Sequence, residues 1–104
     1  MSSNLPRHWA LMAELWPELS EKVEPWRNYL NEDQTIPRKY KELMMVAMCA
    51  VLRYSPGIKT HAELAIAHGA TKEELFATVA QTMTVGGLTA YREACLTLEE
   101  HLAK

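Results

Sequence analysis

The chain has 104 residues, a length that suits a single domain, and we expect one domain over residues 1–104. Its 11 basic and 13 acidic residues give a net charge of −2, which does not favour a nucleic-acid-binding protein. No stretch approaches the roughly 20 apolar residues that cross a bilayer, and the first residues lack a secretory pattern, so we expect no membrane partner and a cytoplasmic location.

The N-terminal third contains three prolines, each acceptable in the first turn of a helix and poor in its interior. We expect a short helix over Arg7–Leu15 and one or two more between Pro17 and Leu30. A polar loop should follow from Asn31 to Ile36. We expect the three tryptophans to pack against the core or against a neighbouring subunit. They are Trp9, Trp16 and Trp26.

The central stretch predicts two successive helices. The first, over Pro37–Arg53, is apolar around most of its circumference, which is typical of a central helix or a subunit interface. Ser55 and Pro56 suit the N-cap and first residue of the second, Pro56–His68. The short connection should make the two helices antiparallel neighbours. The basic trio at the start of the first helix is expected to be solvated. It consists of Arg38, Lys39 and Lys41.

The remaining sequence also predicts helices. Gly69 suits a left-handed helix cap, and Thr71 with Glu74 has the spacing of a capping box. The following helix should break at Gly86-Gly87, and a last one should run from about Leu88 to Leu102. Because no alternating strand pattern of useful length is present, the predicted fold class is all-α, a compact bundle of roughly five to seven helices.

Glu42 and His61 are the candidate catalytic pair. If the second helix folds back closely on the first, the carboxylate would orient the imidazole ring and raise its pKa, as at many acid–base sites. The alternative is a histidine bonded to a backbone carbonyl with no reaction to perform. Tyr54 could place a phenolic donor near His61, or it could pack with its hydroxyl in water.

Two further features leave structural and functional interpretations open. Gly86 and Gly87 could allow a close approach to a neighbouring helix or to a ligand, although helix termination alone explains them. Cys49 and Cys95 lie in apolar patterns and suggest buried free thiols in a reducing compartment. There is no zinc-type spacing, so we expect no metal.

The sequence resembles the carboxymuconolactone decarboxylase family, which shares its fold with alkyl hydroperoxidase D. The resemblance covers Lys41 to about Ala94 and implies an alkyl hydroperoxidase D-like bundle that assembles as a homotrimer or homohexamer. The matching pieces are Lys41-Glu42-Leu43, His61 with Ala65 or Ala67, His68-Gly69-Ala70-Thr71 with Glu73-Glu74, and Gly86-Gly87.

The hydroperoxidase branch of that family uses a glutamate, a Cys-x-x-Cys pair and a histidine four residues after the second cysteine. By position these residues correspond to Glu42, Tyr54, Gly57 and His61. Because neither cysteine position holds a thiol, the resemblance argues against peroxide reduction by a dithiol. Cys49 lies about one and a half turns before the first of these positions and cannot simply replace it.

The branch without the cysteine pair implies a cofactor-free decarboxylase that acts on a small carboxylated lactone of aromatic catabolism. In this interpretation His61 protonates the dienolate left by loss of carbon dioxide, Glu42 holds His61, and Tyr54 binds a substrate oxygen. Arg53 is the nearest candidate cation for the substrate carboxylate, although a helix-end arginine is often only solvated. We expect Gly86 and Gly87 to contact the substrate as well.

Two other functions stay open at this point. The chain could be a non-catalytic small-molecule-binding or assembly protein on the same fold, because fold does not fix function. It could also be a thiol-dependent peroxide reductase that uses Cys49 or Cys95. Under the decarboxylase hypothesis we expect no cofactor, and the partners are a small-molecule substrate and further copies of the chain.

Overall fold

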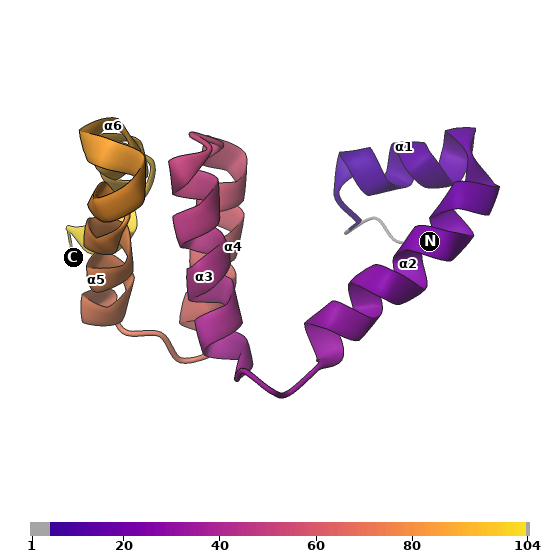
Figure 1. The fold of residues 1–104 in the computed structure, drawn as a ribbon, viewed down its shortest axis with the longest axis horizontal. Coiled ribbons are helices and arrows are strands. Elements are labelled where there is room, and N and C mark those ends of the chain that lie inside the picture. The colour runs from indigo at the N-terminus through magenta and orange to yellow at the C-terminus, as the bar shows by residue number, and fades with distance from the viewer. Residues whose placement is uncertain (1–4, 104) are drawn as a thin grey trace. The chain divides into compact units, whose positions relative to one another are not determined.

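The computed structural model describes residues 5–103, and in this range it contains helices and no strand. The all-α prediction is therefore confirmed for the described part of the chain. The chain divides into two compact units, Met1–Gln34 and Thr35–Lys104. Each unit is described by itself below, and Figure 1 labels the helices of both except the last.

The first unit contains α1 (Arg7–Leu15) and α2 (Pro17–Glu32), which pack against each other. The first helix has the predicted bounds. The second is a single helix through Pro25, which is one of the two predicted alternatives, and it differs from prediction only in continuing into the expected loop as far as Glu32. Pro25 has no backbone N–H, so this 16-residue helix lacks one backbone hydrogen bond at that position.

The tryptophans of the first unit do not form a core. Trp16 and Trp26 are 59% and 61% exposed, so the predicted core packing is wrong for both, whereas packing against a neighbouring subunit stays a prediction. Trp9 is partly buried, and the guanidinium carbon of Arg27 lies 4.4 Å from its ring centroid. This cation–π contact links α1 to α2.

The second unit holds five helices within residues 35–103, and α3 and α4 form its most extensive helix pair. Their short connection makes them neighbours, as predicted. The fully buried core side chains include Val46, Ile58, Leu75, Val79 and Leu98. The helices are α3 (Arg38–Val51), α4 (Ser55–Ala67), α5 (Lys72–Gln81), α6 (Met83–Thr97) and α7 (Glu99–Leu102).

The helix boundaries follow local capping chemistry. Gly69 has a φ of +100° and ends α4, as predicted. Thr71 and Glu74 form the predicted capping box, with both reciprocal hydrogen bonds at 3.0 Å. The prediction for the start of α4 is wrong by one residue. Tyr54 is its N-cap, and Ser55 is already helical.

The end of α3 is closed by a residue in the left-handed region. Arg53 has a φ of +57°, so the helix stops short of the predicted last residue. The backbone N–H of Arg53 donates to Ala50 O at 3.0 Å, and that of Tyr54 donates to Cys49 O at 2.8 Å. These two bonds form a Schellman-type cap, which usually employs glycine at the left-handed position. The sharp reversal places α4 beside α3.

Candidate functional site

Glu42 and His61 meet on the facing sides of α3 and α4. Glu42 Oε1 lies 2.7 Å from His61 Nδ1. The glutamate is buried with 3% of its surface exposed, whereas 26% of the histidine side chain is accessible. The imidazole therefore contacts a carboxylate, as the first interpretation required, and not a backbone carbonyl.

Arg38 is a third member of this cluster that the sequence analysis missed. Its Nε donates to Glu42 Oε2 at 2.5 Å, so the two carboxylate oxygens are bonded to different partners. The available signal was the spacing of four residues, which places Arg38 and Glu42 on one face of α3. The sequence analysis expected the whole basic trio to be solvated and therefore did not assign Arg38 to Glu42.

The basic trio in fact divides among different contacts. Lys39 Nζ lies 3.1 Å from Glu74 Oε2 and connects α3 to the capping box of α5. The hydrogen bond that Lys39 donates to Glu74 raises the pKa of Lys39, while hydrogen bonds from the Thr71 backbone and from Lys39 lower the pKa of Glu74. Lys39 is therefore engaged in holding two helices together.

The electrostatics of the cluster keep Glu42 ionised. Burial alone would raise the pKa of its carboxyl, but hydrogen bonds from Arg38 and His61 outweigh that effect and lower the pKa below its usual range. An ionised carboxylate can only accept a hydrogen bond, so Nδ1 of His61 carries a hydrogen and donates a hydrogen bond to Glu42. The neutral ring is thus fixed in the tautomer whose Nε2 is an acceptor.

Of the two positions of the missing cysteine pair, Gly57 lies about one turn before His61, and Tyr54 lies about two turns before it at the N-cap of α4. A β-carbon at Gly57 would lie 2.6 Å from Cys49 Sγ and 2.7 Å from Tyr54 Cδ2, so the close approach of these side chains requires glycine. The sulfur of Cys49 therefore lies against the second cysteine position, although sequence spacing separates it from the first. Burial raises the pKa of Cys49, which favours the unreactive thiol form.

Arg53 is brought together with Gly86, but at a distance from the dyad. Its guanidinium donates to Gly86 O at 2.7 Å and also to Val51 O and Thr89 Oγ1. These contacts connect the end of α3 to the kink of α6, where Gly87 has a φ of +78°. The nine helical steps from Glu42 to Val51 rise about 14 Å, and Arg53 lies beyond that end of α3.

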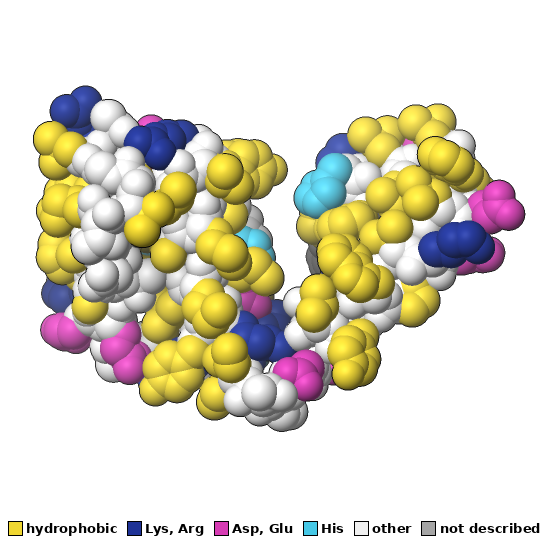
Figure 2. All heavy atoms as spheres, in the orientation of Figure 1, with side chains coloured by type: hydrophobic (Ala, Val, Ile, Leu, Met, Phe, Trp, Pro, Cys, Tyr) yellow, Lys and Arg dark blue, Asp and Glu magenta, His cyan; other side chains and the backbone are white. Residues whose placement is uncertain are grey.

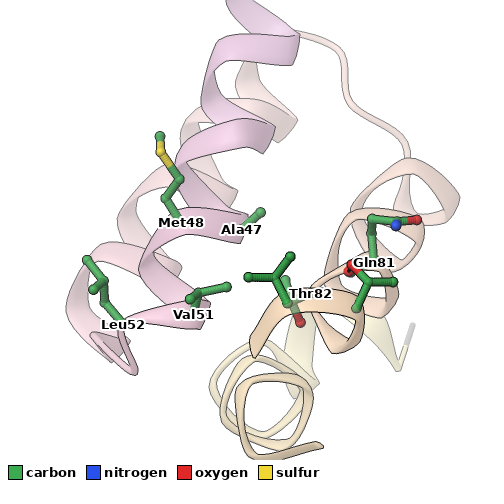
Figure 3. A pocket seen from close by; sticks show the side chains of 8 residues that line it. Ala47, Met48, Val51, Leu52, Gln81 and Thr82 are labelled. Atoms are coloured by element: carbon green, nitrogen blue, oxygen red, sulfur yellow. Dashed lines mark hydrogen bonds between the residues drawn. The ribbon is translucent and has the colours of Figure 1, made fainter. Parts of the chain in front are cut away.

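A separate apolar cavity of about 540 Å³ lies between α3 and the α5–α6 junction (Figure 3). Its lining includes neither Glu42 nor His61, and Figure 2 shows that hydrophobic side chains are exposed on the same unit. This cavity was not predicted from the sequence. It is lined by Ala47, Met48, Val51, Leu52, Gln81, Thr82, Thr84 and Val85.

Residues 5–103 also bear on two other classes of site. Within that range no group of three or more His, Cys, Asp or Glu side chains is arranged to hold a metal ion. None of the helices described there is both long enough and apolar enough to cross a membrane.

Comparisons with known proteins agree on one family. The model of the family described as "Carboxymuconolactone decarboxylase family" matches residues 17–100. The chain is also similar to a crystal structure from Burkholderia xenovorans LB400 described as that of a candidate carboxymuconolactone decarboxylase. The TM-score is 0.80 at 26% sequence identity, and the match covers 95% of this chain and 83% of that one. No curated protein gives a significant match.

Proposed function

The chain belongs to the carboxymuconolactone decarboxylase family, and from this premise we propose that it is a cofactor-free acid–base enzyme that removes carbon dioxide from a small carboxylated lactone. The observation that supports the proposal is the contact of 2.7 Å between His61 and the buried Glu42. A charged carboxylate behind an accessible imidazole suits proton transfer near neutral pH.

The proposed reaction needs one proton and no external electrons. The bond between the leaving carboxylate and its ring carbon breaks, and its electron pair enters a dienolate conjugated with the lactone carbonyl. Protonated His61 then donates from Nε2 to a carbon of the dienolate, and the ring regains its proton from water. The Glu42 carboxylate stabilises the imidazolium before transfer and holds the ring in place afterwards.

We propose that the phenolic hydroxyl of Tyr54 donates a hydrogen bond to a substrate oxygen. It is half exposed, and its ring lies beside Gly57, one helical turn before His61. A donor at this position could stabilise the negative charge that develops on the lactone oxygen. Gly57 allows this arrangement because any side chain there would displace the tyrosine ring.

We also propose that the chain forms a homo-oligomer and acts in the cytoplasm. In support of self-association, Met44 and Met48 on α3 and its C-cap Leu52 are spaced by four residues and are 47%, 52% and 76% exposed. Such a stripe of exposed apolar side chains at the edge of an apolar cavity is typical of a surface that is buried in a protein–protein interface. Sedimentation equilibrium at several protein concentrations would measure the oligomeric state, and a monomer at all of them would contradict it.

Turnover of a carboxymuconolactone tests the catalytic proposal. Carbon dioxide release should be measured with the wild-type protein, with His61→Ala, and with His68→Ala as a matched control. His68 suits this control because its Nδ1 bonds Leu64 O at the end of α4, away from the dyad. We expect loss of a general acid to lower the rate by about 10²–10⁴-fold. Equal rates for wild type and His61→Ala would remove His61 from the mechanism.

The cavity favours one alternative, a non-catalytic protein that binds an apolar small molecule between α3 and α6. Its lining is almost entirely apolar and lacks the proposed acid–base residues. If this alternative holds, the wild type should show no turnover, and Met48→Asp should weaken ligand binding while His61→Ala leaves it unchanged. Isothermal calorimetry with both variants would separate the two functions.

A further inference from the structure

We infer that Arg38 is a positioning residue for the acid–base pair, because it keeps the Glu42 carboxylate charged and directed at His61. Arg38 acts through Glu42 and needs no contact with the substrate. This inference rests on the proposed acid–base function and adds the residue on which that function depends near neutral pH. It assigns a role to a side chain that the sequence pattern placed in a solvated basic trio.

The first support is the geometry around the two carboxylate oxygens of Glu42. Oε1 lies 2.7 Å from His61 Nδ1, and Oε2 accepts a hydrogen bond from Arg38 Nε at 2.5 Å. Arg38 is the first residue of α3, and Glu42 follows one helical turn later on the same face. Because both oxygens are engaged, the carboxylate cannot rotate without breaking both contacts. The bond to Arg38 therefore also fixes the direction of the bond to His61.

The second support is the burial of the negative charge. The Glu42 side chain is only 4% exposed, so water contributes little to the solvation of its carboxylate. A neutral imidazole supplies a hydrogen bond but no charge, whereas the guanidinium of Arg38 stays protonated at any working pH. Without Arg38 the buried carboxylate would have one neutral donor, and burial would favour the protonated carboxylic acid. An uncharged Glu42 could not stabilise an imidazolium at His61.

The charged groups that act on Glu42 come from two helices. Burial raises the pKa of its carboxyl, while hydrogen bonds from Arg38 on α3 and His61 on α4 lower it below its ordinary value. Of the other helices packed on α3, α5 presents Glu74 to Lys39 instead, and within residues 5–103 α6 supplies no charged group that acts on Glu42. Removal of Arg38 therefore changes the charge balance of Glu42 and leaves the acid–base histidine in place.

Titration of the Glu42 carboxyl tests the inference without turnover. Carbon NMR of the full chain, labelled at the glutamate carboxyl, follows this group from pH 8 to pH 3 in wild type, Arg38→Gln, Arg38→Lys and Lys39→Gln. Lys39 provides the matched control, because it is the adjacent cation of α3 and also bonds a glutamate, but one on α5. Carbon dioxide release from a carboxymuconolactone is measured with the same four proteins at pH 6 and pH 8.

We expect the Glu42 carboxyl to take up its proton at a higher pH in Arg38→Gln than in wild type, and at the wild-type pH in Lys39→Gln. The rate of Arg38→Gln should be about ten- to a hundredfold below wild type at pH 6, as for loss of a hydrogen bond to a charged group. The difference should narrow at pH 8, where Glu42 is ionised again. Arg38→Lys keeps the positive charge and should restore most of the rate.

A side chain that only stabilised the fold would lower the rate by the same factor at both pH values. That result would overturn the inference, as would an unchanged Glu42 titration in Arg38→Gln or equal rates for this variant and an active wild type. If Arg38→Gln does not fold, the double variant Arg38→Gln/Glu42→Gln replaces it. Recovery of the fold in the double variant would show that Arg38 is needed to balance Glu42, and an unfolded double variant would overturn the inference.

Failure of the proposed function gives a different pattern of results. If the wild type releases no carbon dioxide but the Glu42 titration moves to higher pH in Arg38→Gln, the control of Glu42 by Arg38 stands and the decarboxylation falls. If the wild type is active and Arg38→Gln matches it in both rate and titration, the decarboxylation stands and the inference falls.

Discussion

Glu42 Oε1 lies 2.7 Å from His61 Nδ1, although the two residues are 19 positions apart and belong to different helices. The contact exists because the left-handed cap at Arg53 reverses the chain at once, so that the start of α3 faces α4. Arg38 occupies the second carboxylate oxygen. The buried carboxylate of Glu42 is thus hydrogen-bonded from both helices, and Arg38 on α3 also supplies a positive charge. A carboxylate in a protein interior requires such partners.

Replacement of Glu42 by glutamine should lower the rate without removing the acid. The amide can still accept from His61 Nδ1, but it carries no charge to stabilise the imidazolium. A hydrogen bond to a charged group contributes about 1.5–3 kcal/mol, so kcat should fall by about ten- to a hundredfold. Steady-state kinetics against the exposed first-turn variant Glu73→Gln checks this. A kcat for Glu42→Gln equal to that of the control would contradict it.

The stability of the protein should fall in acid through Glu42. Its pKa is lowered in the folded state from an ordinary value of 4.5. A lowered pKa stabilises the fold above the unfolded value, and this contribution is lost as pH falls through the folded value. Urea unfolding from pH 6 to pH 3 should therefore show a steeper loss of stability for wild type than for Glu42→Gln.

Glu74 also has a lowered pKa, so some acid sensitivity should remain in Glu42→Gln. Adding Glu74→Gln to Glu42→Gln should flatten the pH dependence further, because both ionisations are then absent. Parallel slopes for wild type and Glu42→Gln would show that Glu42 titrates alike in the folded and unfolded states.

The parts of the fold that follow from local chemistry could be predicted from the sequence. Gly69 and the Thr71–Glu74 pair each have a side-chain or backbone requirement that few alternatives satisfy, and both were confirmed. The contact between Glu42 and His61 followed from a short connection between two helices. Spacing alone did not indicate whether the histidine would meet a carboxylate or a carbonyl.

Other features depend on tertiary contacts that a sequence pattern does not contain. Arg38 and Lys39 are adjacent and equally basic, yet one bonds Glu42 within α3 and the other Glu74 on α5. The sequence also left open whether one or two helices follow Pro17, because an interior proline removes a helical hydrogen bond, and α2 runs through Pro25 as one helix. The apolar cavity arises from three helices together and has no local signal.

Gly57→Ala should destabilise the second unit, because the new methyl group would meet Cys49 Sγ at 2.6 Å and the Tyr54 ring at 2.7 Å. Overpacking of this kind costs about 1–3 kcal/mol in the free energy of unfolding. Cys49→Ala removes the sulfur, so the double variant should recover part of this loss. Urea unfolding of the two single variants and the double variant measures the coupling. Additive effects would place the sulfur away from Gly57.

Arg53 should stabilise the protein through its side chain while its backbone is strained. Its φ of +57° is unfavourable for a residue with a β-carbon by about 1–2 kcal/mol. Its guanidinium compensates by bonding Gly86 O and Thr89 Oγ1. Arg53→Ala loses these bonds and keeps the strain, so it should be the least stable variant.

Arg53→Gly loses the same bonds but relieves the strain. Its free energy of unfolding should therefore be about 1 kcal/mol higher than that of Arg53→Ala. Thr89→Val removes one acceptor, and its effect should largely disappear when Arg53 is already alanine. Thermal and urea unfolding of the four variants tests both statements. If Arg53→Ala were as stable as Arg53→Gly, the left-handed backbone would carry no cost, and the guanidinium contacts alone would explain why arginine occupies the end of α3.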